Sequence, residues 1–114
     1  MTAPICGAIK SVYISGPMTG LPDLNRAAFA WAEAQVIAAG LTPVNPHTLC
    51  DPSWDWQKCM RADVKALCDC DAIFLLQGWE KSQGAQLELH IAHRLGLEVL
   101  TDVYALLGFA GVAK

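Results

Sequence analysis

A glutamate near the start of a helical pattern is the residue of this chain whose position most favours chemistry. A hydroxyl, a glycine and a carboxylate, on Ser82, Gly84 and Glu88, lie between an apolar run at 72–76 and a helical pattern at 85–95. Small-molecule sites form at such a junction, the carboxyl end of a strand in an open α/β sheet. Glu88 is therefore a candidate nucleophile or base, although a glutamate here can also do no more than complement the helix dipole.

Composition and length place the chain among globular proteins. Its 114 residues are enough for one core, so we expect a single domain over residues 1–114. Apolar residues make up 54% and charged residues 17%, which excludes a disordered chain. No apolar stretch approaches the roughly 18 residues that a membrane span needs, and the first ten residues fit neither a signal nor a transit peptide. We therefore expect a cytoplasmic protein with no membrane partner.

The distribution of charge bears on the kind of partner. Net charge is −3, and the eight basic residues are scattered without forming a stripe, so polymeric nucleic acid is not expected as a partner. A single nucleotide remains compatible with the sequence, because helix N-termini and backbone amides can hold a phosphate without net positive charge.

The cysteines are odd in number and show no paired framework, so we expect reduced thiols. A zinc site could recruit His47, Cys50, Cys68 and Cys70, but these residues lack the usual Cys-x-x-Cys spacing, and we expect no metal. The five cysteines are Cys6, Cys50, Cys59, Cys68 and Cys70.

The chain alternates between strand patterns and helical patterns. Strands are predicted at 11–15, 41–45, 72–76 and 97–100, and helices between Asp23 or Asn25 and Gly40, from Ser53 to about Cys68, at 85–95 and at 102–107. Two glycines and two prolines predict that 16–24 is a loop rather than a helix, and Pro43 indicates an edge strand. This order predicts a parallel sheet covered by helices on both faces, with right-handed crossovers.

Three loops leave the carboxyl ends of strands and can converge, at 15–20, 45–54 and 77–84. The first contains Gly16 and Gly20, and glycine permits the backbone to approach a ligand closely. Neither a dinucleotide-binding fingerprint nor a Walker-type loop occurs in the sequence.

Taken together, four motifs resemble those of the nucleoside 2-deoxyribosyltransferase superfamily. They are Val-Tyr-Ile-Ser-Gly-Pro-Met at 12–18, Arg-Ala-Asp at 61–63, Cys70-Asp71 before a strand, and Ser82-Gln83-Gly84 with Glu88. The resemblance spans residues 11–100 and looks closest to an uncharacterised bacterial and phage branch, with similarity also to deoxynucleoside 5′-monophosphate N-glycosidases. It implies a flavodoxin-like (Rossmann-like) α/β three-layer sandwich with a four- to five-stranded parallel sheet.

The resemblance also implies an activity. Such enzymes cleave, by hydrolysis or transfer, the N-glycosidic bond of a 2′-deoxynucleoside or its 5′-monophosphate through a covalent glutamyl-deoxyribose intermediate, here on Glu88. A carboxylate suits this chemistry because it can attack the anomeric carbon and stabilise an oxocarbenium-like transition state. Asp63 matches the aspartate that manages the leaving-group proton, and Tyr13 matches the tyrosine that orients the nucleophile. The resemblance further implies no metal or organic cofactor, and a homo-oligomer with shared active sites.

Substrate contacts are implied by the same resemblance. Ser82 lies six residues before Glu88, where transferases of free nucleosides carry an aspartate and the monophosphate hydrolases a serine. A serine hydroxyl and the amides near Gly84 suit an anion, which favours a 5′-phosphate. The first loop, however, lacks the arginine of those hydrolases, and Arg26 or Arg61 would have to substitute for it.

The loop beneath the sugar or base is matched by Ser15, Gly16, Pro17 and Met18. Trp79 could stack on a base, or it could equally fill a core or a subunit contact. Two other classes of function remain open, because one fold hosts many functions. They are a non-catalytic nucleotide-binding or sensing module and a scaffold protein that has kept the fold.

Overall fold

The structure, a computed structural model, describes residues 10–111. Its strands form one parallel sheet in the order β2-β1-β3-β4, as expected for a flavodoxin-like α/β fold. The strands are β1 (Ser11–Ser15), β2 (Thr42–Val44), β3 (Ala72–Leu75) and β4 (Glu98–Leu100). The α-helices are α1 (Arg26–Ala38), α2 (Trp56–Cys68), α3 (Gln83–Arg94) and α4 (Val103–Ala110). Pro43 lies on an edge strand, as predicted.

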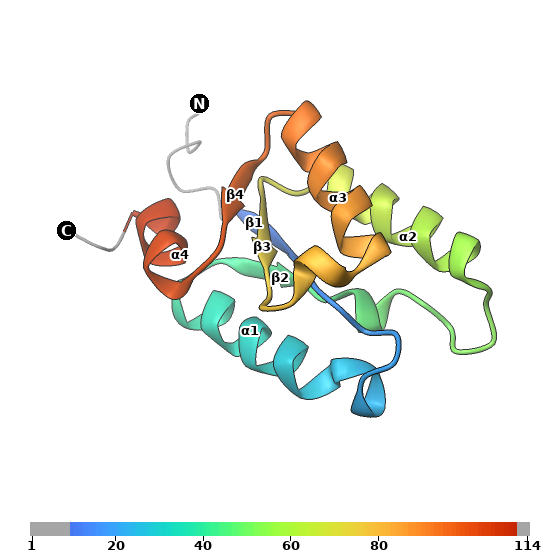
Figure 1. Ribbon diagram of the computed structural model, residues 1–114. Helices are drawn as coiled ribbons and strands as arrows, with labels where there is room; N and C mark the ends of the chain where they lie inside the picture. The colour runs from blue at the N-terminus through green and yellow to red at the C-terminus, as the bar shows by residue number, and fades with distance from the viewer. Residues whose placement is uncertain (1–9, 112–114) are drawn as a thin grey trace.

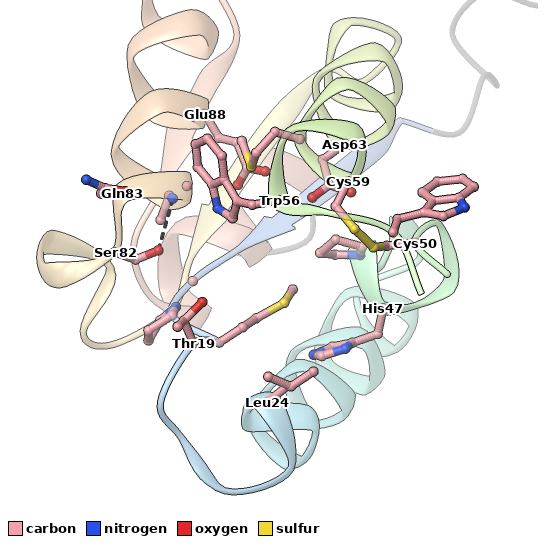
Figure 2. Close-up of a pocket in the computed structure, with 18 of the residues that line it drawn as sticks. Thr19, Leu24, His47, Cys50, Trp56, Cys59, Asp63, Ser82, Gln83 and Glu88 are labelled. Carbon is pink, nitrogen blue, oxygen red and sulfur yellow. Dashed lines mark hydrogen bonds between the residues drawn. A yellow bond between two sulfur atoms is a disulfide. The ribbon is translucent and has the colours of Figure 1, made fainter. Parts of the chain in front are cut away.

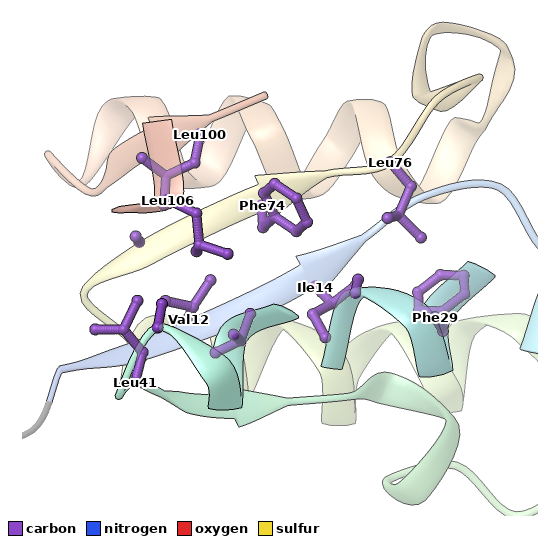
Figure 3. Packing of buried hydrophobic residues seen from close by; sticks show 12 residues of the cluster. Val12, Ile14, Phe29, Leu41, Phe74, Leu76, Leu100 and Leu106 are labelled. Atoms are coloured by element: carbon purple, nitrogen blue, oxygen red, sulfur yellow. The ribbon is translucent and has the colours of Figure 1, made fainter. Parts of the chain in front are cut away.

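Helices cover both faces of the sheet, with α1 and α4 on one side and α2 and α3 on the other (Figure 1). Successive side chains of a strand point to opposite faces. Val12 and Ile14 of β1 therefore pack toward α1, where Phe29 and Leu106 complete a core (Figure 3). Tyr13 and Ser15 point toward the side of α2 and α3. The central strand thus supplies apolar side chains to one face and two hydroxyls to the other.

Short side chains that accept backbone N–H groups begin three of the helices. Asp55, Ser82 and Asp102 occupy the N-cap positions of α2, α3 and α4, and each accepts an N–H from the third residue of its helix. This helix was expected to start at Ser53, but α2 begins at Trp56, and the N–H and hydroxyl of Ser53 bind the carboxylate of Asp51 at 2.8 and 2.7 Å.

The loop that follows β1 differs from the expectation, because a short 3-10 helix (Pro22–Asn25) interrupts it. Asp23, Leu24 and Asn25 have positive φ angles of 50°, 52° and 62°, a conformation that Asp and Asn tolerate better than Leu. Asn25 lies at the N-cap of α1, yet its side chain makes no cap and donates instead to the carbonyl of Pro17 at 2.9 Å. A contact eight residues back along the chain is invisible to a local cap pattern.

Two further 3-10 helices lie at the same edge of the sheet, at Pro46–Thr48 and Trp79–Lys81. The expectation of reduced thiols is wrong for Cys50 and Cys59, which form a disulfide with a Cα–Cα distance of 5.3 Å. The chain turns back between Ser53 and α2, and this turn brings the two cysteines together. Cys68 and Cys70 are free thiols, and Cys6 lies outside the described residues.

Two of the expectations concern metals and membranes. Within residues 10–111, no three or more His, Cys, Asp or Glu side chains gather in a way that could hold a metal ion. In the same range, every helix is too short or too polar to cross a lipid bilayer.

Gly16 allows the end of β1 to approach β3 closely. A Cβ on Gly16 would meet Cβ of Leu76 at 2.7 Å, next to the hydrogen bond of 2.8 Å from the Leu76 N–H to the Ser15 carbonyl. We expect Gly16→Ala to lower the free energy of unfolding by about 1–3 kcal/mol, because the backbone at Gly16 and the side chain of Leu76 would have to move apart. Chemical denaturation measures this change.

Gly108 of α4 provides the matched control, because a Cβ there meets open space. Gly108→Ala should raise the free energy of unfolding by about 0.5–1 kcal/mol, since alanine is the better helix former. Equal effects of the two substitutions would contradict the steric role of Gly16.

Candidate active site

The carboxylate of Glu88 is buried at the point where β1 passes beneath α3. Its side chain is only 5% exposed, and both of its oxygens accept hydroxyl hydrogen bonds. The hydroxyl of Tyr13 donates to Oε2 at 2.8 Å, and that of Ser15 donates to Oε1 at 2.6 Å. A buried carboxylate needs such donors, because desolvation penalises its charge.

The pKa of Glu88 is raised to about 7, chiefly by burial and also by the charge of Asp63, whereas the two hydroxyl hydrogen bonds lower it. Burial and the neighbouring carboxylate raise the pKa of Tyr13, so its hydroxyl keeps the proton that it donates. A pKa shifted this far by burial and a neighbouring carboxylate, in a group beside a cavity, marks Glu88 as a candidate functional residue.

A cavity of about 590 Å³ opens beside Glu88 at the carboxyl edge of the sheet. This volume is in the range of small-molecule sites. Figure 2 shows Glu88, Ser82 and Gln83 on the α3 side of the cavity and Asp63 with Cys59 on the α2 side. Its lining residues in the three loops and α1 are Gly16, Pro17, Met18, Thr19, Leu24, Arg26, Pro46, His47, Cys50, Asp51, Pro52, Trp54, Lys81 and Ser82.

Asp63 is the second buried acid of the cavity. It is 7% exposed, and among the described residues its Oδ1 has no hydrogen-bond partner. Burial raises its pKa to about 6. A carboxyl group without a partner, poised near neutral pH and lining a cavity, is suited to exchange a proton with a bound molecule.

The N-terminus of α3 forms another part of the wall. The Ser82 Oγ accepts the Ala85 N–H at 3.1 Å, which leaves its O–H free to donate into the cavity. Gly84 packs closely against α2, as shown by the distance of only 3.2 Å that a Cβ at this position would have to Sδ of Met60. The exposed Lys81 also lines this end. Hydroxyl, helix N-terminus and ammonium together favour an anion.

The opposite end of the cavity contains residues that the motifs did not indicate. The ring of His47 packs edge-on against Phe29 with the centroids 4.8 Å apart. Burial, and then the charge of Arg26, lower the pKa of His47, which favours the neutral imidazole. The Cys50–Cys59 disulfide and the side chain of Trp56 also line the cavity. Trp56 is 47% exposed, although Met60, one turn later on the same face of α2, is buried. Only the position of His47 and Cys50 after a predicted strand end could have indicated them, and no sequence pattern indicated Trp56 and Cys59 of α2.

The structure brings together most of the residues that the sequence singled out. Glu88 and Asp63 line the cavity together with Gly16, Pro17, Met18, Ser82 and Gly84. Tyr13 and Ser15 lie behind Glu88, away from the cavity wall, and bind its carboxylate.

Trp79 lies elsewhere. It packs against the core on the α2 and α3 side, and it lines a separate, shallower hollow with Leu89, His90 and Val99. The turn of the 3-10 helix that begins at Trp79 carries its ring away from the cavity, a rotation that the sequence pattern cannot indicate.

Comparisons with known proteins agree with this fold. Residues 10–101 match the family model described as Domain of unknown function (DUF4406). The structure is similar to the 2-desoxiribosyltransferase from Leishmania mexicana, with a TM-score of 0.65 and 25% identity over 81% of this chain and 63% of that one. This chain thus spans under two thirds of the length of that protein.

The fold also resembles that of the 2-deoxyribosyltransferase from Bacillus psychrosaccharolyticus. The TM-score is 0.62 at 18% identity, over 78% of this chain and 69% of that one. No curated protein matches the sequence. The flavodoxin-like fold implied by the sequence is therefore confirmed, and the family resemblance is supported at the level of the superfamily.

Substitution of Glu88 tests the electrostatic cost of its burial. Because the folded state raises the pKa from 4.5 to about 7, the native state binds this proton more tightly than the unfolded chain. The resulting contribution to stability is present below about pH 4.5 and is lost as pH rises through 7. At pH 8 the free energy of unfolding of Glu88→Gln should therefore exceed that of the wild type by up to about 3 kcal/mol, and the variant should unfold at a higher temperature. At pH 4.5 the two proteins should differ little.

The amide of glutamine can still accept from one hydroxyl and donate to the other, so the packing is retained. Glu80→Gln is the control, since Glu80 is exposed and should show no such dependence on pH. Thermal unfolding at both pH values measures the difference. If Glu88→Gln lost the same stability at pH 4.5 and at pH 8, the idea that burying the ionised carboxylate destabilises the fold would be contradicted.

Proposed function

This chain belongs to the DUF4406 family, and we propose that it cleaves the N-glycosidic bond of a 2′-deoxynucleoside or its 5′-monophosphate with Glu88 as the nucleophile. The observation that carries the proposal is the buried Glu88 carboxylate, held by two hydroxyls on a cavity that a second acid, Asp63, also lines. The likeness of the fold to a 2-desoxiribosyltransferase at 25% identity supports the class of reaction.

The first step forms a covalent intermediate. A Glu88 oxygen attacks the anomeric carbon C1′ while the bond from C1′ to the base nitrogen breaks, and its electron pair leaves with the base. Asp63 supplies the proton that neutralises the departing base, and so becomes a carboxylate. The negative charge of Glu88 also stabilises the oxocarbenium-like transition state before the new bond is complete.

The second step releases the sugar. Water, or the nitrogen of a second base, attacks C1′ from the face that the first base left, and the bond to Glu88 breaks with its electrons returning to the carboxylate. The proton of the attacking group passes to Asp63. Two displacements give net retention at C1′, and both carboxyl groups return to their starting state.

The 5′-phosphate, where the substrate carries one, would bind at the N-terminus of α3. The free O–H of Ser82, the ammonium of Lys81 and the partial positive charge of the helix terminus all favour an anion there. Arg26 lines the same cavity, but its guanidinium already pairs with Asp23 at 3.3 Å. A free deoxynucleoside would leave this anion-favouring end occupied by water.

Turnover is tested by incubating the protein with each common deoxynucleoside and 5′-monophosphate, with and without a second base. Chromatography follows the free base and any new nucleoside. We expect release of base by the wild type and a loss of at least about 10³-fold in Glu88→Gln, because the nucleophile is removed. Intact-mass spectrometry of the quenched reaction should detect the deoxyribosyl adduct in the wild type only.

Absence of turnover on every substrate, with the protein folded, would overturn the proposal. Binding of a nucleotide that persists in Glu88→Gln without any turnover would point instead to a non-catalytic nucleotide-binding module.

The pH profile of kcat/KM tests the roles of the two acids. The reaction needs one proton on the pair, with Glu88 ionised and Asp63 protonated, and the pKa values of the pair are about 7 and about 6. Activity should therefore peak between pH 6 and 7 and fall by roughly tenfold per pH unit on either side, since below this window both groups are protonated and above it neither is.

Asp63→Asn is the matched variant for this profile. We expect a loss of about 10²–10⁴-fold in activity. The variant should also lose the alkaline limb, because no acid is left to deprotonate, while the acidic limb of Glu88 remains. An alkaline limb that persists in Asp63→Asn would show that another group supplies the proton.

A further inference from the structure

We propose that Ser15 is a positioning residue, whose hydroxyl holds Oε1 of Glu88 and with Tyr13 fixes the plane of the carboxylate. This inference deepens the proposed function and rests on it for its catalytic consequence. The hydrogen bond itself can be tested without any substrate.

The location of Ser15 favours this role over contact with a substrate. Its side chain is only 1% exposed, and it lies outside the set of residues that line the cavity. Its hydroxyl donates to Oε1 of Glu88 at 2.6 Å, within the distance typical of a strong O–H···O⁻ bond. Because the Ser15 hydroxyl donates its proton to Glu88 and is covered by that residue, Ser15 can affect a substrate only through Glu88.

Two donors determine the orientation of a carboxylate, whereas one does not. A single hydrogen bond to Oε2 leaves the group free to rotate about its last carbon–carbon bond. The second bond to Oε1 removes this freedom. Tyr13 and Ser15 can make the two bonds because residues two apart on a strand point to the same face.

The backbone of Ser15 is itself fixed, which makes its hydroxyl a precise donor. Ser15 pairs with Leu75 in the sheet, and its carbonyl accepts the Leu76 N–H at 2.8 Å. The close contact of Gly16 with Leu76 holds the next residue in place. Only the rotation of one side-chain bond remains, so the position of the hydroxyl follows from the register of β1 and β3.

The bond also stabilises the charged form of Glu88. Burial and Asp63 of α2 oppose ionisation, while Ser15 and Tyr13 of β1 favour it. Among the described residues these are the groups that bear on the ionisation of Glu88. Loss of the Ser15 hydroxyl would leave Oε1 of Glu88 buried without a hydrogen-bond donor. The neutral acid would then become more stable relative to the carboxylate, and the pKa of Glu88 would rise.

Ser15→Ala tests the inference through the titration of Glu88. Carboxyl carbon-13 NMR of protein labelled in glutamate follows the titration, and the resonance missing from Glu88→Gln identifies the residue. We expect the pKa of Glu88 to rise by about one pH unit, the effect of losing one hydrogen bond to a charged group. Ser11→Ala is the control, because Ser11 lies on the same strand and binds Asp71 instead.

A second variant guards against a general loss of packing. Ser15→Cys keeps the shape and a weaker donor, so the pKa of Glu88 should rise by less than in Ser15→Ala. Because Glu88 has the higher pKa of the pair, a rise of one unit should move the alkaline limb of the kcat/KM profile upward. It also makes the reactive form scarcer, which lowers activity at pH 7 by about fivefold. KM should change little, because Ser15 does not touch the substrate.

The outcomes separate this inference from the proposed function. An unchanged pKa of Glu88 in Ser15→Ala would overturn the positioning role, whatever the activity. A raised pKa in a protein whose wild type shows no turnover would support the hydrogen bond and overturn the catalytic proposal. A raised KM with an unchanged alkaline limb would assign Ser15 to substrate contact and also overturn the inference.

Discussion

The burial of one carboxylate determines the arrangement of the site. Glu88 is removed from water, and an ionised carboxylate in such a place is stable only when donors replace its lost hydration. The donors come from β1, the central strand, at a distance of 73 and 75 residues along the chain. The register of the sheet therefore decides whether Glu88 can carry a charge. A shift of β1 by one residue would replace both hydroxyls, by Val12 and Ile14 in one direction or by Ile14 and Gly16 in the other.

The same burial sets function against stability. Asp63 has no partner for one oxygen, and both acids have pKa values raised toward neutrality. A site that served stability alone would pair these groups or replace them with apolar side chains. Such unfavourable features concentrate at functional sites, where the surrounding structure must maintain them. Here the surroundings are the apolar core of Val12, Ile14 and Phe74, which holds the central strands together from the opposite face.

The sequence predicted the parts of the fold that depend on local patterns. The four strands, the edge position of Pro43, the parallel sheet and the helices after each strand follow from periodicity and from glycine and proline punctuation. Glu88, Tyr13 and Asp63 were indicated by the family resemblance, and the structure brings them to one site, whereas their chemical roles stay predictions.

The expectations that differed from the structure depend on contacts distant in the chain or on the rotation of short segments. Asn25 binds Pro17 instead of capping α1, and Asp51 binds Ser53 before it can cap α2. The approach of Cys50 to Cys59 depends on that same turn. The rotation of the 3-10 helix at Trp79 decides on which side its ring lies. No periodicity or propensity records such contacts, because each depends on the completed fold.

The distribution of charge along the cavity relates these features to a substrate. In the proposed reaction the two acids make and break the bonds to the anomeric carbon, and an anion beside them would be repelled by Glu88 and Asp63. The groups that favour an anion, Ser82 and Lys81 with the N-terminus of α3, are gathered at the other side of Glu88 along its own helix. The glycosidic bond and the 5′-phosphate group are carried by C1′ and C4′, the two carbons that flank the ring oxygen of deoxyribose. One ligand could therefore place its glycosidic bond at the two acids and its phosphate at the N-terminus of α3. Glu88 follows Ser82 by six positions, less than two turns of α3, which gives the helix a span comparable to that of the sugar.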